Sequence, residues 1–347
     1  MTSRFDSRSR GTLVVVAVVA VLVLGGCIGD DGLDRGGEES EPDAPAGELE
    51  IHHVDVGQAD ATLLVTPSGE TILIDTGDWR DDGRDVIDYL EERGVDRIDH
   101  LVATHAHADH IGGHAAVIEH LEEDGDGVGA AYDSGVVHTS ATYDRYLEAV
   151  EAYDVTLFQV AEGDELPLED DATDATVLNP PGDESGDDLH YNSVALTVTF
   201  GEFTYLTTGD AERDAEQRLL EDRPEELAAD VYQAGHHGSS TSSTEPFLDA
   251  VEPQVAVISS AEDSQYGHPH DEVLESFADR GVETYWTGVH GHVVVTTDGE
   301  ETRVETEREA PTNPADLRDH EPEGGTIAPS LDGPAAIGSS AAAASSD

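Results

Sequence analysis

The folded part of the chain opens with three short apolar runs separated by Gly and Pro, at residues 49–56, 61–66 and 71–74. Runs of this length between turn residues are typical of consecutive antiparallel strands. Residues 84–93 then place Val86, Ile87 and Leu90 at helical spacing, which predicts an amphipathic helix. The apolar stretch at residues 100–104 predicts a short buried strand that leads into a histidine-rich loop.

Apolar spacing in the rest of the chain alternates between the helical and the strand period. It predicts helices at residues 113–122, 142–152, 211–221, 246–251 and 271–280. It predicts strands at residues 155–160, 175–178, 194–200, 203–208, 230–233, 255–259 and 292–296. Mixed strands and helices behind opening hairpins favour an α/β (α+β layered) fold, with sheets flanked by helices.

Two segments lack both apolar content and periodicity. Residues 28–47 are rich in Gly, Asp, Glu and Pro, and residues 309–347 end in an Ala/Ser-rich stretch. Neither segment can offset its ordering entropy by burial, so we expect a disordered tether and a disordered tail. These limits leave residues 48–308 as the single folded domain.

Residues 1–27 have the charge and hydropathy of a targeting signal. Three arginines precede an apolar run at residues 13–24, which is shorter than the roughly 20 residues of a membrane span. Cys27 is the only cysteine, and it follows Leu-Gly-Gly in a pattern that resembles the lipobox of lipoproteins. We expect a lipid anchor on Cys27 that leaves the chain on the extracellular face of the cell membrane. The alternatives are an uncleaved anchor helix and a plain buried thiol.

The charge of the chain is strongly one-sided. Asp and Glu number 77 against 16 basic residues, all of them Arg, and the net charge is −61. Such a surface repels itself in dilute buffer, where the Debye length is roughly 30 Å at 0.01 M salt. The composition therefore predicts a protein adapted to molar salt and resembles that of haloarchaeal proteins; an acidic tail for basic partners is the alternative. A broad basic track for nucleic acid is excluded, so any phosphate has to be met by metal.

Three histidines and an aspartate fall within the short run Thr-His-Ala-His-Ala-Asp-His at residues 104–110. Alternate residues of an extended loop, His105 and His107, can converge on one ion, while Asp109 and His110 turn towards a second. Imidazole with carboxylate suits Zn²⁺, and Mn²⁺ or Fe²⁺ also fit. The sequence therefore predicts a site for two metal ions, against the alternative of a solvated histidine-rich loop.

This run resembles the His-x-His-x-Asp-His signature of the metallo-β-lactamase superfamily, which implies an αββα sandwich with the metals at one edge. Five further motifs resemble the ComEC-type branch, whose prototype is the hydrolase-like domain of a DNA-uptake competence protein. They are HVDVGQADA at 53–61, LIDTG at 73–77, TGD at 208–210, HHGS at 236–239 and YGHPH at 266–270. The similarity covers residues 49–306.

Several matched positions carry roles that the resemblance implies. Asp210 is placed to bridge both ions through its two carboxylate oxygens, unless it only caps the helix that follows. Asp75 is placed beneath the site to accept the second N–H of a ligand histidine, unless it is only a turn residue. Asp60 lies in a loop whose residues fit either a cleft lining or turn chemistry.

Two adjacent histidines, His236 and His237, are expected to point to different sides of the chain, so that one ligates the second ion. We expect His236 to be this ligand, and His237 to act as a site acid or to contact the substrate. His268 either completes the second ion or contacts the substrate. Asn192 matches the ComEC-type pattern where other superfamily members supply a third histidine, so either the nearby His190 or water completes the first ion.

The remaining histidines and the tryptophans have simpler interpretations. His52 and His53 are expected to be one buried and one exposed strand residue, and His114 a residue on a helix surface. Trp79 and Trp286 are expected in the core.

Two ions of this kind polarise a substrate oxygen and lower the pKa of a shared water towards roughly 7, so attack by a metal-bound hydroxide is the expected chemistry. Asp109 would orient the hydroxide, and His237 would assist the leaving group. The resemblance implies a phosphodiester substrate, which includes DNA. The alternatives are hydrolysis of another ester, lactone or thioester, and a non-catalytic, metal-containing surface binding protein. No feature of the sequence identifies a protein partner.

Overall fold

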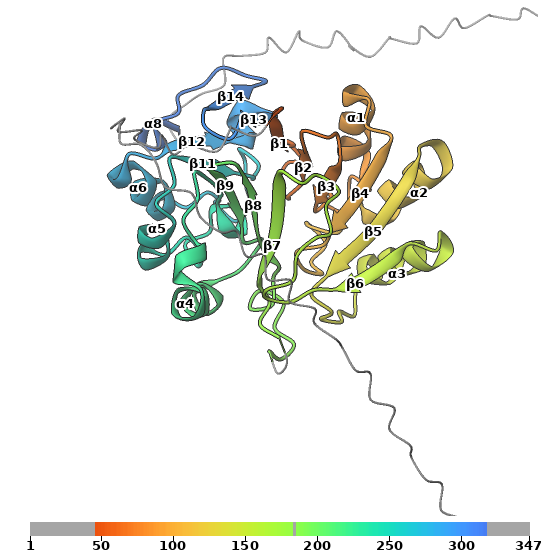
Figure 1. Ribbon diagram of the computed structural model, residues 1–347. Helices are drawn as coiled ribbons and strands as arrows, with labels where there is room; N and C mark the ends of the chain where they lie inside the picture. Colours follow the sequence, from red (N-terminus) through yellow and green to blue (C-terminus); the bar gives the residue numbers. More distant parts are fainter. Residues whose placement is uncertain (1–45, 183–184, 318–347) are drawn as a thin grey trace, which may run out of the picture. The chain divides into compact units, whose positions relative to one another are not determined.

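Within residues 46–182 and 185–317, which the computed structural model describes, two β-sheets pack face to face with helices on their outer sides (Figure 1). The arrangement is the αββα sandwich that the sequence predicts. An apolar core lies between the sheets, where Ile51, Leu64 and Ile72 of one sheet belong to the same cluster as Val177 and Leu196 of the other.

The first sheet has eight strands in the order β14-β13-β1-β2-β3-β4-β5-β6. They are β1 (Leu49–His53), β2 (Thr62–Val65), β3 (Thr71–Ile74), β4 (Arg97–Val102), β5 (Gly127–Asp133), β6 (Thr156–Gln159), β13 (Val293–Thr297) and β14 (Thr302–Thr306). Strands β1, β2 and β3 pair antiparallel, which confirms the predicted opening. Strands β3 to β6 are parallel.

The second sheet has six strands in the order β12-β11-β10-β9-β8-β7. They are β7 (Thr173–Asn179), β8 (Ala195–Phe200), β9 (Phe203–Thr207), β10 (Val231–Gln233), β11 (Val255–Ile258) and β12 (Glu283–Trp286). Strands β7 to β9 are antiparallel and β9 to β12 are parallel.

Helices bury the outer face of each sheet. The described helices are α1 (Arg84–Arg93), α2 (His114–Asp124), α3 (Ala141–Ala152), α4 (Arg213–Asp222), α5 (Glu245–Val251), α6 (Asp271–Arg280), α7 (Thr287–His290) and α8 (Pro314–Leu317), with 3₁₀ turns η1 (Pro224–Glu226) and η2 (Gly235–Gly238). Leu63 packs in the cluster of the α1–α3 side, whereas its neighbour Leu64 packs between the sheets. Because successive strand residues point to opposite faces and both faces are covered, the strands read as continuous apolar runs.

The sequence pattern misses three strands, β5, β12 and β14. Strand β5 is built largely from Gly and Ala and therefore has little apolar signal. Strand β14 is an edge strand whose side chains are mostly exposed, so it lacks an apolar face. Strand β12 is only four residues long and follows directly on a helix.

The chain remains ordered beyond the predicted domain boundary at 308. Helix α8 packs against α6 and β12, and its Leu317 is buried. The predicted tail therefore begins too early, because this leucine belongs to the apolar cluster of the second sheet. The predicted signal and tether, including Cys27, lie almost wholly outside the described residues. Among the described helices, none is both long and apolar enough to cross a membrane.

The carboxyl ends of β4, β9, β10 and β11 lie at one edge of the sandwich. In the second sheet, Thr207, Gln233 and Val257 are paired in register near those ends. The loops that follow carry the histidine run, Asp210 and the pair of adjacent histidines. The topology thus brings the predicted site residues to one place.

Candidate metal centre

The loop after β4 is held from below by Asp75. The Thr104 backbone N–H donates to Asp75 Oδ1 at 2.9 Å, and the Thr104 hydroxyl donates to Oδ2 at 2.6 Å. His110 Nδ1 also lies 2.7 Å from Oδ2, so the contact predicted for Asp75 is present. This carboxylate fixes Nδ1 of His110 as a donor and leaves Nε2 for the site.

Asp210 lies directly after β9 and is fully buried. Its backbone N–H donates to Ser193 Oγ at 3.1 Å. Gly209 precedes it with φ +50°, where a Cβ would collide with Ser193 and Thr104. Asp210 Oδ2 lies 3.5 Å from His105 Nε2, and Oδ1 lies 3.1 Å from His110 Nε2. The two oxygens therefore face different histidines, as a bridging carboxylate requires.

The ligand atoms on the Oδ2 side of Asp210 form what we term the first group: His105, His107, His190 and Asp210. These atoms lie within 4.8 Å of one another. The ring of His190 lies 4.9 Å from that of His107, centre to centre. The sequence left open whether His190 or water completes the first ion, and the structure places His190 close enough to do so.

The ligand atoms on the Oδ1 side form the second group: Asp60, His110, Asp210 and His237, again within 4.8 Å of one another. Asp109 borders this group, since its Oδ2 lies 3.5 Å from His237 Nε2. Asp60 is buried and accepts from Gln233 Nε2 at 3.0 Å. Local sequence patterns do not single out Asp60 as a site residue, because its partner Gln233 is distant in the chain.

The adjacent histidines occupy different sides of the site, and His237 is the one that lies in the second group. His237 faces the second group, and its Nδ1 lies 3.0 Å from the Ser259 carbonyl oxygen. His236, which the sequence assigned to the second ion, instead places Nε2 3.4 Å from Asp210 Oδ2 and Nδ1 3.4 Å from Glu212. Both histidines have positive φ, +52° and +56°, and this backbone sets their directions where an extended strand was assumed.

The charges of the two groups differ. Burial lowers the pKa of His105 well below its ordinary value and also lowers that of His107. Burial alone would do the same in the second group, but the carboxylates of Asp210 and Asp75 raise the pKa of His110 well above its ordinary value. Burial is likewise outweighed at His237, where Asp60 and Asp210 raise the pKa to about 9. Without an ion, protons on these histidines balance the buried carboxylates.

The buried atoms of the second group fit a cation. His110 Nε2, His237 Nε2 and Asp210 Oδ1 have no hydrogen-bond partner among the described residues. Leaving such atoms unsatisfied costs about 1–3 kcal/mol each. A divalent ion among them would satisfy all three, and imidazole with carboxylate is a suitable ligand mixture.

Other predicted site residues lie around the two groups. His268 is close but belongs to neither, since its ring lies 5.8 Å from His236 and its Nδ1 lies 3.4 Å from Gln58 Nε2. Asn192 is buried, and its amide donates to the Asp188 carbonyl at 2.8 Å. It therefore shapes the loop that carries His190.

Exposed aromatic residues border the metal centre. Trp79 is 48% exposed, and its backbone N–H donates to Ala108 in the histidine loop. The prediction of a core position for Trp79 is wrong, because it stands on a loop with the Arg80 guanidinium 5.1 Å from its ring. Trp286 is buried as predicted. Tyr266 is 59% exposed, with its ring 5.7 Å from that of His268.

Three histidines are more buried than the sequence suggested. His52 and His53 are both buried, because both faces of the first sheet are covered. His114 is fully buried, which corrects the predicted surface position. It lies at the start of α2, where its Nδ1 is 2.6 Å from the Thr76 hydroxyl and its ring packs edge-on against Tyr146.

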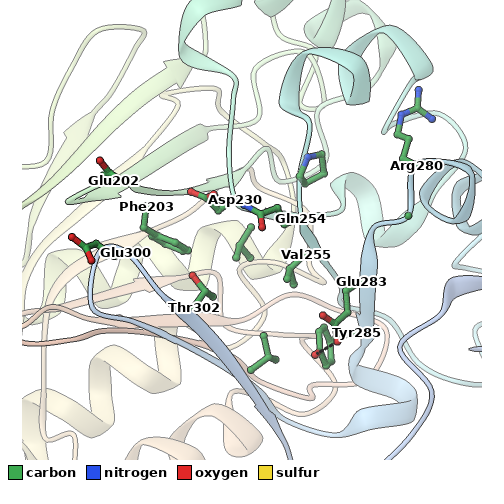
Figure 2. A pocket seen from close by; sticks show the side chains of 14 residues that line it. Glu202, Phe203, Asp230, Gln254, Val255, Arg280, Glu283, Tyr285, Glu300 and Thr302 are labelled. Carbon is green, nitrogen blue, oxygen red and sulfur yellow. Dashed lines mark hydrogen bonds between the residues drawn. The ribbon is translucent and has the colours of Figure 1, made fainter.

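A large cavity lies away from this site. It has a volume of about 950 Å³ and lies where β9, β10 and β12 begin, at the opposite ends of the strands (Figure 2). Its lining includes Glu202, Asp230, Glu283 and Glu300, and its one basic side chain, Arg280, is paired with Glu245 and Asp249. Size alone therefore does not identify the functional site.

Comparison with known proteins agrees with the geometry. Residues 54–262, more than half of the chain, match the family model described as the metallo-beta-lactamase superfamily. The ComE operon protein 3 of Bacillus subtilis (strain 168) is 29% identical, over 71% of this chain and 33% of that protein. The competence protein ComA of Neisseria gonorrhoeae is also 29% identical, over 71% of this chain and 32% of that protein. The chain thus spans about a third of the length of these relatives.

Among solved structures, a diphosphatase of the PhnP family is 18% identical to this chain, with a TM-score of 0.45. The match covers 72% of this chain and 97% of that structure.

Proposed function

The chain belongs to the metallo-β-lactamase superfamily, and from this premise we propose that it is a binuclear metal-dependent hydrolase of phosphodiesters. The observation that carries the proposal is the position of Asp210, whose two oxygens each face a separate group of histidines. Such a carboxylate can hold two ions roughly 3.5–4 Å apart, the spacing of two-metal hydrolases.

The ligand assignment depends on which ring nitrogen each carboxylate faces. Asp60 Oδ2 lies 3.8 Å from His110 Nδ1 and 3.6 Å from His237 Nδ1, behind the rings, so we give it a supporting role. Asp109 Oδ2 lies 3.5 Å from His237 Nε2, on the side of the site. We assign His105, His107 and His190 to the first ion, Asp109, His110 and His237 to the second, and Asp210 to both. The ligand mixture suits Zn²⁺, with Mn²⁺ or Fe²⁺ as alternatives. When bound, two such ions polarise a phosphoryl oxygen and activate a water for attack.

The residues of the chain supply orientation and shielding. Asp75 and the Ser259 carbonyl hold Nδ1 of His110 and of His237, so both Nε2 atoms stay directed at the site. Asp109 is only partly buried, so its carboxylate is reachable by the attacking water and can orient it. His236 is one-fifth exposed and the buried His268 lies beside it, with the two rings 5.8 Å apart. From there they can contact the departing part of the substrate.

We further propose that the substrate is single-stranded DNA or a similar phosphodiester that carries aromatic rings. The net charge of −61 provides no basic track, so affinity has to come from the metals and from uncharged contacts. Trp79 and Tyr266 are exposed beside the site, and exposed aromatic rings stack on unpaired bases at about 1–3 kcal/mol per base. The names of the competence-protein relatives agree with DNA.

We also propose that the protein acts at the extracellular face of the cell membrane in molar salt, anchored by a lipid on Cys27. The lipobox-like sequence and the acidic composition support this location. The anchor is tested by mass spectrometry of the membrane fraction, where Cys27→Ser should abolish both the lipid adduct and membrane retention.

The test of function uses the full chain in molar KCl. Bound metal is counted, and hydrolysis of bis(p-nitrophenyl) phosphate and of single- and double-stranded DNA is followed for wild type, His107→Ala and Asp210→Ala. His120→Ala is the matched control, because His120 lies on α2 outside both metal groups. Two bound ions with turnover lost in both site variants support the proposal. Metal without phosphodiester turnover would redirect it to other esters, and a folded chain that binds no metal would refute it.

A further inference from the structure

The assignment of ligands leaves one histidine of the adjacent pair without a metal. His236 is one-fifth exposed at the mouth of the site. Its Nε2 faces Asp210 Oδ2, the same oxygen that faces His105. Its left-handed backbone is an unfavourable conformation for a side chain with a Cβ, costing about 1–2 kcal/mol. An interaction specific to this geometry is therefore expected to hold the loop.

Two groups face His236 Nδ1: the Thr241 hydroxyl at 3.3 Å and the carboxylate of Glu212, and only Glu212 faces a second histidine as well. Its Oε1 lies 3.4 Å from His236 Nδ1 and 3.5 Å from His190 Nδ1. The two rings lie 4.8 Å apart, centre to centre, although they come from loops before β8 and after β10. A carboxylate at Nδ1 retains the proton there and leaves Nε2 free to bind an ion.

Glu212 stands where a side chain commonly caps a helix, but its carboxylate does not cap α4. It is the N-cap residue of α4, where a carboxylate would ordinarily accept a hydrogen bond from a backbone N–H of the first turn. Its side chain makes no such bond. The carboxylate is instead turned towards the two histidines.

We propose that Glu212 is the positioning residue of the first group: it ties the loops of His190 and His236 together and keeps His190 turned towards the first ion. This inference rests on the proposed metal centre. The inference predicts an effect on the first ion alone. The histidines of the second group are already held by other residues: Asp75, Asp60 and Ser259. Loss of Glu212 therefore weakens one ion and spares the other.

The experiment titrates the metal-free full chain with Zn²⁺ and with Co²⁺, without substrate, in molar KCl. Glu212→Gln keeps the size of the side chain and removes its charge. Loss of a carboxylate behind a ligand histidine typically weakens metal binding 10–100-fold, so the affinity for one ion should fall by this factor while the other stays within about twofold. Asp214→Asn, an exposed carboxylate on the same helix, should change neither affinity.

Three further variants identify the affected ion. The ion weakened in Glu212→Gln should be the one lost in His190→Ala, not the one lost in His237→Ala. Glu212→Gln added to His190→Ala should cause little further loss, because the carboxylate acts through that histidine. Circular dichroism verifies that each variant is folded.

The other outcomes would contradict either the role of Glu212 or the metal centre itself. Equal weakening of both ions, unchanged affinities in Glu212→Gln, or additive losses in the double variant would overturn the role of Glu212. So would a wild type with three ions and a Glu212→Gln with two, because Glu212 would then be a ligand itself. A wild type that binds no ion would instead refute the metal centre on which the inference rests.

Discussion

The first and second groups share Asp210 but are built in different ways. The second is enclosed in the sandwich, where buried carboxylates and a carbonyl hold His110 and His237. In the first, His107, His190 and the supporting Glu212 are all only partly buried. The contrast indicates that the second group is fixed before an ion arrives, whereas the first depends on surface loops.

Charge follows the same division. In the second group the buried carboxylates outweigh the effect of burial on His110 and raise its pKa, whereas in the first group burial prevails and lowers the pKa of His105. Buried carboxylates placed in advance concentrate negative potential where a cation is to bind. One half of the centre therefore has strong electrostatic attraction for metal, and the other has mainly the coordinating power of neutral imidazoles.

The largest effect is expected at the residue that joins the groups. Asp210→Asn removes a charge that both groups use and replaces one oxygen by an amide nitrogen, which does not bind these ions. Turnover should fall by at least roughly 1000-fold, and both metal affinities should fall together. Metal titration beside steady-state kinetics measures this. If Asp210→Asn weakened only one ion, the two groups would not share this residue.

The next largest effect is expected on the affinity for the second ion alone. Asp75→Asn removes the carboxylate behind His110, and Asn tolerates the left-handed backbone present there, φ +58°. We expect the second ion to bind 10–100-fold more weakly and the first to change little. The result should mirror that of Glu212→Gln, and competition with a chromophoric chelator would resolve the two affinities. Equal losses would show that the groups are one electrostatic unit.

In both groups, the sequence predicts the ligands better than the residues that support them. The sequence predicts His105, His107 and His110 because one short loop holds them at the correct spacing, and Asp210 because the TGD motif at 208–210 resembles the family's. Two supporting residues, Asp60 and Glu212, were not predicted, and the reason is physical. Asp60 meets Gln233 across 173 positions of the chain, and Glu212 meets two separate loops. Such contacts depend on how the two sheets pack, which no local pattern records.

The adjacent histidine pair shows the same limit at a smaller scale. His236 and His237 point to different sides as expected, but not for the expected reason, because they lie in the turn η2 and not in an extended strand. Strand alternation also does not say which side holds the second ion. The left-handed backbone at both residues decides this. The fold was better predicted, since the missed elements are the strands β5 and β14 with weak apolar signal and the four-residue elements β12, α7 and α8.

A moderate effect is expected at His114, a buried histidine that lies outside both groups. His114 lies four residues after His110 and is equally buried, but it faces the Thr76 hydroxyl, and burial lowers its pKa to about 4. An unfolded histidine has a pKa of about 6.5, so the folded state favours neutral His114. This stability is complete above pH 6.5 and is lost as pH falls towards 4.

The free energy of unfolding should therefore fall by about 2 kcal/mol between pH 7.5 and pH 5 through this residue. Denaturant unfolding of the metal-free chain in molar KCl measures the slope, which His114→Asn should flatten. His120→Asn, on the same helix but partly exposed, should leave it unchanged. An identical slope in His114→Asn would mean that His114 is not the titrating group.

The smallest effect concerns the open side of the centre, where the first group meets solvent. Trp79→Ala should weaken binding of a phosphorothioate oligothymidylate by about tenfold, since one stacked base contributes about 1–3 kcal/mol. Phe158→Ala is the control, because Phe158 is also 48% exposed but lies on the edge strand β6. Trp286 is buried, so quenching of tryptophan fluorescence by the oligonucleotide reports Trp79 directly. An abasic oligonucleotide should neither quench the fluorescence of Trp79 nor distinguish the variants. If it bound as tightly as the thymidylate, the exposed aromatic rings would have no part in recognition. The substrate would then be held by its phosphates and the metals alone.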